Sequence, residues 1–340
     1  MYRPPLLLVL SVLPLISQAL DWKELPPIPD PNGFAGSFAG VSGGALIVAG
    51  GTNFPDKKPW EGGTKLWYDD VFVLPTPDGG WRKAGKLPKA NGYGVSITTD
   101  AGVVIVGGGN ATEHFRDVVL LQWNGKTVNV SPLPLLPKAC AFMTGALSGT
   151  TIFVCGGIEK PDATKAMNSL WSLDLSNLDK GWKPHDPLPA AGRILAAGGA
   201  HDGAFFLFSG AALHPDADGK PAREWLKDAW RFSPDSGWKR LADPPRVAVA
   251  VPSPLPLSGT QLLVIGGDDG ALANFEPKEK HPGFPRTVLS YDTKTDVWKK
   301  EGEVPFSLVT TNAVIWDERI VIPGGEARPG VRSPAVWSQQ

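Results

Sequence analysis

The stretch GGEARPGVRSP, residues 324–334, places three charged side chains within seven residues, directly after the apolar run RIVIP. They are Glu326, Arg328 and Arg332. A carboxylate in a semi-enclosed site can accept and donate a proton. A guanidinium group presents a planar fork that binds a carboxylate through two hydrogen bonds. These residue types suit acid–base chemistry on an anionic substrate, but a structural salt bridge between Glu326 and Arg332 explains the pattern equally well.

The diglycine that opens this stretch recurs along the chain. Counted from the second residue of each pair, the intervals are 57, 49, 53, 57 and 58 residues. Each pair ends an apolar run and is followed by a variable loop, a second apolar run and usually a tryptophan, as in GWRKAGKLP and DVWKKEGEVP. This pattern predicts a repeated unit of four short strands, with the glycines closing the second strand and the tryptophan opening the fourth. The pairs are Gly50-Gly51, Gly107-Gly108, Gly156-Gly157, the degenerate Ser209-Gly210, Gly266-Gly267 and Gly324-Gly325.

Units of this kind stack radially as propeller blades, and the repeat resembles the Kelch repeat. The last copy ends at SPAVWSQQ without its tryptophan strand, whereas LDWKELPPIP, residues 20–29, is such a strand without a preceding copy. Pairing the two ends would leave no strand edge open. We therefore predict an all-β fold, a six-bladed Kelch-type β-propeller over residues 20–340, closed by pairing of the N-terminal strand with the C-terminal blade.

The first 19 residues differ in kind from the rest. They contain Arg3, an apolar stretch from Leu6 to Ile16, and the small residues Ser17 and Ala19. This is typical of a secretory signal peptide; the stretch is short for a membrane anchor. We expect an exported protein, periplasmic or secreted, that is soluble after cleavage. The net charge of −1 gives no reason to expect nucleic acid or an anionic membrane surface as a partner.

Cysteine and histidine suggest no metal or cofactor. Cys140 and Cys155 are expected on neighbouring strands, where a disulfide and two buried free thiols are both open. The histidines have no metal-ligand spacing and are interpreted as loop residues. A copper radical oxidase, which needs a cross-linked tyrosine and clustered histidines, is disfavoured. The histidines are His114, His185, His201, His214 and His281.

In a propeller of such blades, the loops after the diglycines and the segments leading into the innermost strands share one face. The loop after Gly325 is short, whereas those after Gly51, Gly210 and Gly267 are long. Long walls around a short loop predict a concave ligand site above the central channel. Aromatic residues of the long loops suit sugar rings, although we expect most of them to pack against neighbours: Trp60, Trp67, Trp225 and Phe284.

Among the residues that directly follow the six diglycine positions, only Asp268 and Glu326 are carboxylates. Arg332 stands at the expected start of the third strand and therefore points to the same mouth. Asp268, Arg193 and Arg246 are further candidates for substrate binding, each with a structural or solvated role as the alternative.

Gly-Glu-Ala-x-Pro-Gly-x-Arg, matched at Gly325, Glu326, Ala327, Pro329, Gly330 and Arg332, resembles the cyclically permuted Kelch mutarotases, the N-acetylneuraminate epimerase family. The loop GGTNFPDKKPWEGG, residues 50–63, resembles the first-blade insertion of that family. The resemblance implies an isomerase that interconverts the α and β anomers of sialic acid. Glu326 would move the proton, and Arg332 would hold the sugar carboxylate or the developing oxyanion. We expect further substrate contacts from Arg328 and Asn53.

The start of the chain differs from that of the enterobacterial enzymes, which implies a circular permutation of the same ring. A non-catalytic propeller that binds glycans or proteins is the alternative, since a fold does not settle a function. The expected partner is a small-molecule sugar, with no cofactor, and the protein is expected to be a monomer or a weak oligomer.

Overall fold

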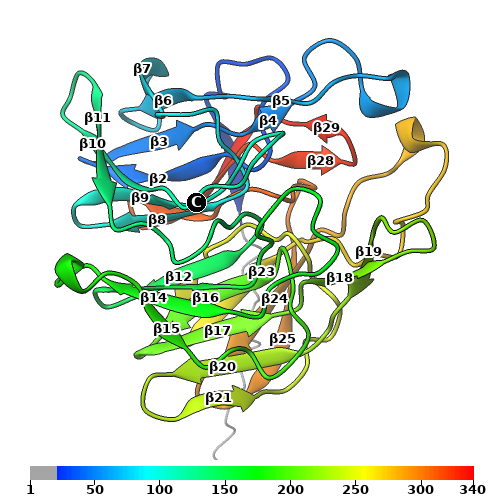
Figure 1. Ribbon diagram of the computed structural model, residues 1–340. Helices are drawn as coiled ribbons and strands as arrows, with labels where there is room; N and C mark the ends of the chain where they lie inside the picture. The colour runs from blue at the N-terminus through cyan, green and yellow to red at the C-terminus, as the bar shows by residue number, and fades with distance from the viewer. Residues whose placement is uncertain (1–20) are drawn as a thin grey trace, which may run out of the picture.

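The computed structural model describes residues 21–340, so the predicted signal peptide lies outside the described residues. Six four-stranded antiparallel sheets stack around a central axis (Figure 1), which confirms the predicted propeller. Blade 1 contains β2 (Phe38–Ser42), β3 (Ala45–Ala49), β6 (Asp70–Leu74) and β7 (Arg82–Lys86). Blade 2 contains β8 (Val95–Thr99), β9 (Gly102–Val106), β10 (Val118–Trp123) and β11 (Val128–Leu133). Blade 3 contains β12 (Thr144–Ser148), β13 (Thr151–Cys155), β14 (Leu170–Asp174) and β15 (Lys183–His185).

The remaining blades follow the same plan. Blade 4 contains β16 (Ala197–His201), β17 (Ala204–Phe208), β20 (Ala229–Ser233) and β21 (Gly237–Arg240). Blade 5 contains β22 (Leu257–Ser258), β23 (Gln261–Ile265), β24 (Thr287–Asp292) and β25 (Val297–Glu303). Blade 6 contains β26 (Val314–Trp316), β27 (Arg319–Pro323), β30 (Val336–Gln339) and β1 (Trp22–Leu25).

Blade 6 is built from both ends of the described chain. Strand β1 pairs with β30 in antiparallel register, from Trp22 opposite Gln339 to Leu25 opposite Val336. The predicted closure by the N-terminal strand is thus confirmed. Its effect is to give β30 a partner on each side and to complete the ring of sheets.

The second strand of each blade is apolar because neighbouring blades cover both of its faces. All five residues of β3, ALIVA, are buried, and β9 shows the same pattern. The diglycine follows this strand directly and turns the chain toward the axis. At Gly325, φ is +115° and an added Cβ would lie 2.9 Å from the carbonyl oxygen of Val309, so a side chain there would be both strained and crowded.

Tryptophans of the outermost strands fasten neighbouring blades together. In four blades the indole N–H donates to a backbone carbonyl just beyond the outermost strand of the preceding blade, at 2.7–2.9 Å. Blade 2 has Val130 in place of the tryptophan, and Trp22 of blade 6 packs edge-on against Phe306 instead. The indoles that donate are Trp81 to Pro26, Trp182 to Pro134, Trp238 to Asp186, and Trp298 to Ala242.

A closed ring of backbone hydrogen bonds surrounds the axis where the chain enters each innermost strand. One residue per blade donates its N–H to the carbonyl of the equivalent residue in the preceding blade, at 2.7–2.8 Å, and the sixth bond closes the circle. All six residues adopt a positive φ of 54–63°. We call them the floor ring: Gly36, Tyr93, Phe142, Leu195, Ala250 and Thr310.

Three hairpins extend the loops that follow the diglycines. They are β4–β5 (Thr52–Asn53 and Leu66–Trp67), β18–β19 (Ala211–Pro215 and Pro221–Trp225) and β28–β29 (Glu326–Arg328 and Val331–Arg332). Figure 1 shows β18–β19 and β28–β29 projecting on the same side of the propeller. Short 3₁₀ turns η1 (Pro59–Glu61), η2 (Leu178–Lys180) and η3 (Lys278–Lys280) complete the structure, and no helix within residues 21–340 has the length and apolarity to cross a membrane.

Two expectations about individual residues need correction. Cys155 ends β13, but Cys140 precedes β12 rather than lying on it, and both thiols are buried and free. The histidines are not all in loops. His185, His201 and His214 lie in strands, while His114 and His281 are buried in loops.

Candidate active site at the mouth of the propeller

The residues that follow the six diglycine positions occupy equivalent places, as the repeat predicts. Each forms an isolated β-bridge with the segment that leads into the innermost strand of its own blade. Glu326 pairs in this way with Val309, and Asp268 pairs with Val249. The predicted convergence of these loops and segments on one mouth is therefore observed.

A cavity of about 340 Å³ lies at this mouth. The floor-ring residues Tyr93, Phe142 and Leu195 line it, so the ring separates it from the narrower channel along the axis. Its walls come from the three hairpins and the loop before β24. The charged lining residues are Lys65, Arg223, Asp268, Glu326 and Arg332.

Glu326 and Arg332 face each other across the β28–β29 hairpin. A guanidinium nitrogen of Arg332 donates to Oε1 of Glu326 at 2.5 Å. The backbone N–H of Gly330 donates to the same oxygen at 2.7 Å. Among residues 21–340, no protein group donates a hydrogen bond to Oε2 of Glu326, and Glu326 lines the cavity.

Arg332 is held more tightly than its partner. Its side chain is 4% exposed, compared with 19% for Glu326, and its guanidinium lies 5.1 Å from the ring centre of Phe54. The buried Nε of Arg332 finds no hydrogen-bond partner among the described residues. The salt bridge that the sequence left open is thus present. This salt bridge is compatible with a binding site, because Glu326 and Arg332 both line the cavity.

Tight contacts around Gly330 explain why the turn of this loop contains a glycine. Gly330 has a φ of +78°, and an added Cβ would lie 2.8 Å from Pro59 and 3.1 Å from Trp60. The β4–β5 loop therefore packs directly on the β28–β29 turn. This contact holds the N–H of Gly330 in position to bind Glu326.

Asp268 lies at the mouth, whereas Arg328 and Asn53 do not reach the cavity. Asp268 lines the cavity wall, and one of its oxygens accepts the N–H of Gly270 at 2.9 Å. Arg328 is turned away and donates to the carbonyl of Glu279. Asn53 is fully buried, and its amide contacts Asp30, the carbonyl of Gly33 and the Tyr68 hydroxyl.

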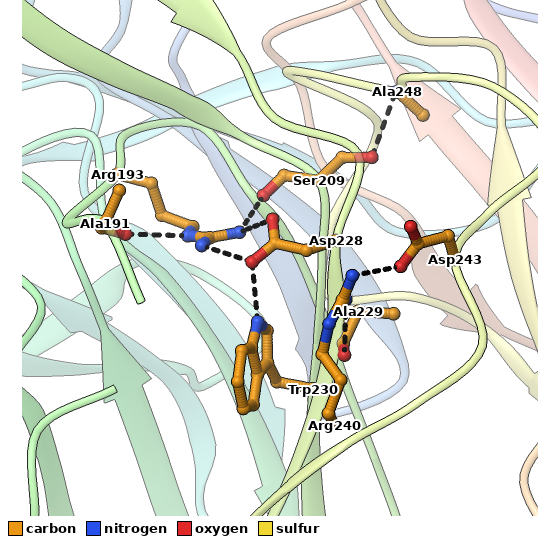
Figure 2. A network of polar contacts seen from close by, with 9 residues as sticks. All are labelled: Ala191, Arg193, Ser209, Asp228, Ala229, Trp230, Arg240, Asp243 and Ala248. Carbon is orange, nitrogen blue, oxygen red and sulfur yellow. Dashed lines mark hydrogen bonds and ion pairs between the residues drawn. The ribbon is translucent and has the colours of Figure 1, made fainter. Parts of the chain in front are cut away.

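Arg193 stands in the segment that connects blade 3 to blade 4, and its side chain lies in a buried polar network with residues of blade 4 (Figure 2). Two nitrogens of its guanidinium donate to the two oxygens of Asp228 at 2.7 and 2.8 Å, and one of them also donates to the carbonyl of Ser209. Burial alone would raise the pKa of Asp228, but the hydrogen bonds and charge of Arg193 outweigh it and lower that pKa. The backbone of Arg193 accepts the N–H of Gly157 and donates to the carbonyl of Met167, both next to strands of blade 3. Arg193 therefore joins two blades and does not line the cavity.

Arg246 is also engaged by the backbone. Its guanidinium donates to the carbonyls of Val247, Gly266 and Thr287, and it does not line the cavity. Burial lowers the pKa of this group. Arg193 and Arg246 thus share one structural task, which is to bind the carbonyls and side chains that converge around a diglycine turn.

Sequence reasoning missed several residues of the cavity. Lys65 and Phe54 belong to the long β4–β5 loop, and Arg223 lies on β19. Of the four aromatic residues proposed for the walls, Phe284 lines the cavity, while Trp60 packs on Gly330 and Trp225 packs on Gly270. Tyr93 and Phe142 line the floor instead. The floor could have been found from spacing, because five of the six ring residues stand 15 positions before the second residue of the following diglycine pair.

The fold and the mouth together define the class of protein: a six-bladed Kelch-type propeller with a paired carboxylate and guanidinium at the end of its axis. The solved structure of YjhT has this fold. It aligns with a TM-score of 0.66 over 91% of this chain and 95% of that one, at 17% sequence identity.

Sequence comparisons relate part of the chain to one family. The family model of N-acetylneuraminate epimerase matches residues 11–130. An N-acetylneuraminate epimerase of Vibrio cholerae is 38% identical over 125 residues, which is 32% of each chain. One from Yersinia enterocolitica is 26% identical over 235 residues, 62% of this chain and 57% of the relative. The chain thus covers 32% of the Vibrio cholerae relative and 57% of the Yersinia enterocolitica relative. The resemblance to the N-acetylneuraminate epimerase family is confirmed.

Proposed function

We propose that this protein is a sugar mutarotase that interconverts the α and β anomers of N-acetylneuraminate. The observation that carries the proposal is the arrangement of Glu326, one of whose oxygens is fixed while the other is free in a cavity of about 340 Å³. The names of the related proteins support this substrate. The enzyme would be an isomerase without a cofactor.

In the proposed mechanism, the free oxygen of Glu326 takes the proton of the anomeric hydroxyl while the bond between the anomeric carbon and the ring oxygen breaks. The protonated Glu326 gives this proton to the ring oxygen as that oxygen leaves, which yields the open-chain ketone. Rotation about the adjacent carbon–carbon bond presents the other face of the carbonyl, and the reverse steps close the ring. Protons and electrons balance over the cycle, because the proton that Glu326 takes is returned.

Arg332 supports this chemistry in two ways. Its hydrogen bond to Oε1 fixes the carboxylate, so that no reorganisation is needed when the proton moves. Its positive charge also stabilises the oxyanion that develops on the substrate. One nitrogen of Arg332 already donates to Glu326. We therefore assign Arg332 to the developing oxyanion rather than to the sugar carboxylate.

We propose further that residues 1–19 direct export and that the propeller over residues 20–340 acts as a soluble monomer or weak oligomer in the periplasm or outside the cell. The support is the sequence pattern of the first residues and the closure of the ring within one chain.

The direct test is anomer exchange of N-acetylneuraminate followed by NMR, at a pH where the spontaneous rate is slow. We expect the exchange rate to rise in proportion to protein concentration. Binding of the sugar with exchange at the buffer rate would instead support a non-catalytic glycan-binding propeller.

A further inference from the structure

Lys65 extends into the mouth cavity from the β4–β5 loop, one residue before β5. Its ammonium nitrogen lies 5.4 Å from the ring centre of Tyr93, 5.5 Å from that of Trp67 and 5.9 Å from that of Phe54. These distances lie within the range of cation–π attraction. Two rings of the β4–β5 hairpin and one from the segment before β8 thus hold one positive charge at the edge of the cavity.

This cage fixes the charge without neutralising it. An ammonium group has three hydrogen-bond donors, and aromatic faces attract the cation without accepting those hydrogen bonds in the way a carboxylate does. Among residues 21–340, Lys65 forms no ion pair with any aspartate or glutamate. Lys65 is therefore a positioned cation whose donors are available to a ligand.

The other two cations of the cavity are less suited to bind an anion. Arg332 is already paired with Glu326. Arg223 lies on the exposed β19 strand, where solvent and salt screen its charge. Lys65 is partly buried among aromatic rings, where a charge attracts an anion more strongly.

The shared ring of Phe54 places Lys65 close to the proposed chemistry. Lys65 Nζ and the Arg332 guanidinium lie 5.9 and 5.1 Å from the centre of this ring, so they are at most about 11 Å apart. In N-acetylneuraminate the carboxylate and the anomeric hydroxyl are bonded to the same carbon. Because Lys65 and Glu326 line the same cavity, a sugar bound there can present its carboxylate to Lys65 and its hydroxyl to Glu326.

We infer that Lys65, held by Phe54, Trp67 and Tyr93, binds the carboxylate of the substrate and selects acidic sugars over neutral ones. This inference rests on the proposed function, because it names the substrate class of the same site. It also separates two tasks: Arg332 positions Glu326 and faces the developing oxyanion, whereas Lys65 binds the charge that the substrate carries throughout the reaction.

The test compares Lys65→Met with the wild-type protein on N-acetylneuraminate and on its neutral methyl ester. We expect KM for the acid to rise about ten- to hundredfold with kcat changed less than about twofold, which corresponds to about 1.4–2.8 kcal/mol of lost binding. KM for the methyl ester should stay at the wild-type value. Lys65→Arg should recover most of the affinity for the acid, because it restores the positive charge.

Lys57→Met is the matched control, since Lys57 is an exposed lysine of the same loop that does not line the cavity. It should match the wild type on both sugars. An unchanged KM for the acid in Lys65→Met overturns the inference, as does an equal rise for acid and ester. A rise in KM for the acid in Arg223→Met, without such a rise in Lys65→Met, would also overturn the inference and would assign carboxylate binding to Arg223.

Binding measured by calorimetry separates this inference from the proposed function. If the wild type binds N-acetylneuraminate without accelerating exchange, the proposed function fails, and a loss of binding in Lys65→Met still supports the carboxylate site. If exchange is accelerated but Lys65→Met behaves as the wild type, the function stands and the inference fails. If the wild type neither binds nor exchanges the sugar, both fail.

Discussion

Replacement of Arg193 by methionine tests whether this arginine joins blades or binds substrate. The change removes both hydrogen bonds to Asp228 and the one to the Ser209 carbonyl, while the methionine keeps much of the apolar stem. Asp228 would be left as a largely buried carboxylate with the Trp230 indole as its remaining side-chain partner. Breaking a buried ion pair in this way costs about 3–5 kcal/mol.

The loss of stability translates into a measurable shift. At about 2.1 cal/mol/K of unfolding entropy per residue, the 320 residues of 21–340 carry about 0.7 kcal/mol/K. A loss of 3–5 kcal/mol therefore lowers Tm by about 5–7 °C. Thermal unfolding followed by circular dichroism measures this shift, and NMR exchange well below Tm should give wild-type kcat and KM for N-acetylneuraminate.

Arg193→Met combined with Asp228→Asn is the matched control. Because it removes both charges, it should be less destabilised than the sum of the two single variants. A Tm within about 1 °C of the wild type, or a raised KM with unchanged Tm in Arg193→Met, would refute the structural role.

Two further predictions concern acid stability and thiol reactivity. Arg193 lowers the pKa of Asp228 below its ordinary 3.8, so the stabilisation from this pair is fully present above about pH 4 and is lost as pH falls through the lowered value. In urea titrations, the difference in unfolding free energy between wild type and Asp228→Asn should therefore shrink from pH 5 to pH 3. A constant difference would contradict this reasoning. Burial raises the pKa of both thiols, that of Cys155 to about 12. A thiol reagent at pH 8 should therefore label neither cysteine in the native protein and both cysteines after denaturation. Rapid labelling of either cysteine in the native protein would contradict the observed burial.

The repeat made the fold predictable because its glycines have a strict backbone task. Each diglycine must turn a buried strand toward the axis at positive φ, so its recurrence marked every blade. The tryptophans were equally informative, since their indoles join neighbouring blades. The missing tryptophan strand of the last copy then indicated the closure that β1 and β30 form.

The site was only partly predictable. Glu326 and Arg332 are six residues apart on one hairpin, so their proximity follows from local spacing. Arg193 was misleading because its partner Asp228 lies 35 residues away and its burial depends on how two blades pack. Lys65 was missed for a related reason. Two of its rings lie in its own loop, but Tyr93 comes from the next blade, and no local pattern shows that all three surround one ammonium group.

The floor ring shows where residue preferences give way to tertiary structure. Glycine is the residue that most easily adopts a positive φ, yet only Gly36 of the six is a glycine. The inter-blade hydrogen bond of each ring residue holds the others in this conformation. As a result Tyr93 and Phe142 present aromatic side chains to the cavity floor.

The most direct test of the central claim is the exchange rate of N-acetylneuraminate anomers with Glu326→Gln. The substitution keeps the size of the side chain and an oxygen that can accept from Arg332 and Gly330, but it removes the group that carries the proton. We predict that kcat falls at least about a hundredfold, as expected for loss of a general acid–base group, while Tm and sugar binding are largely kept. A Glu326→Gln protein that exchanges the anomers at the wild-type rate would contradict the account.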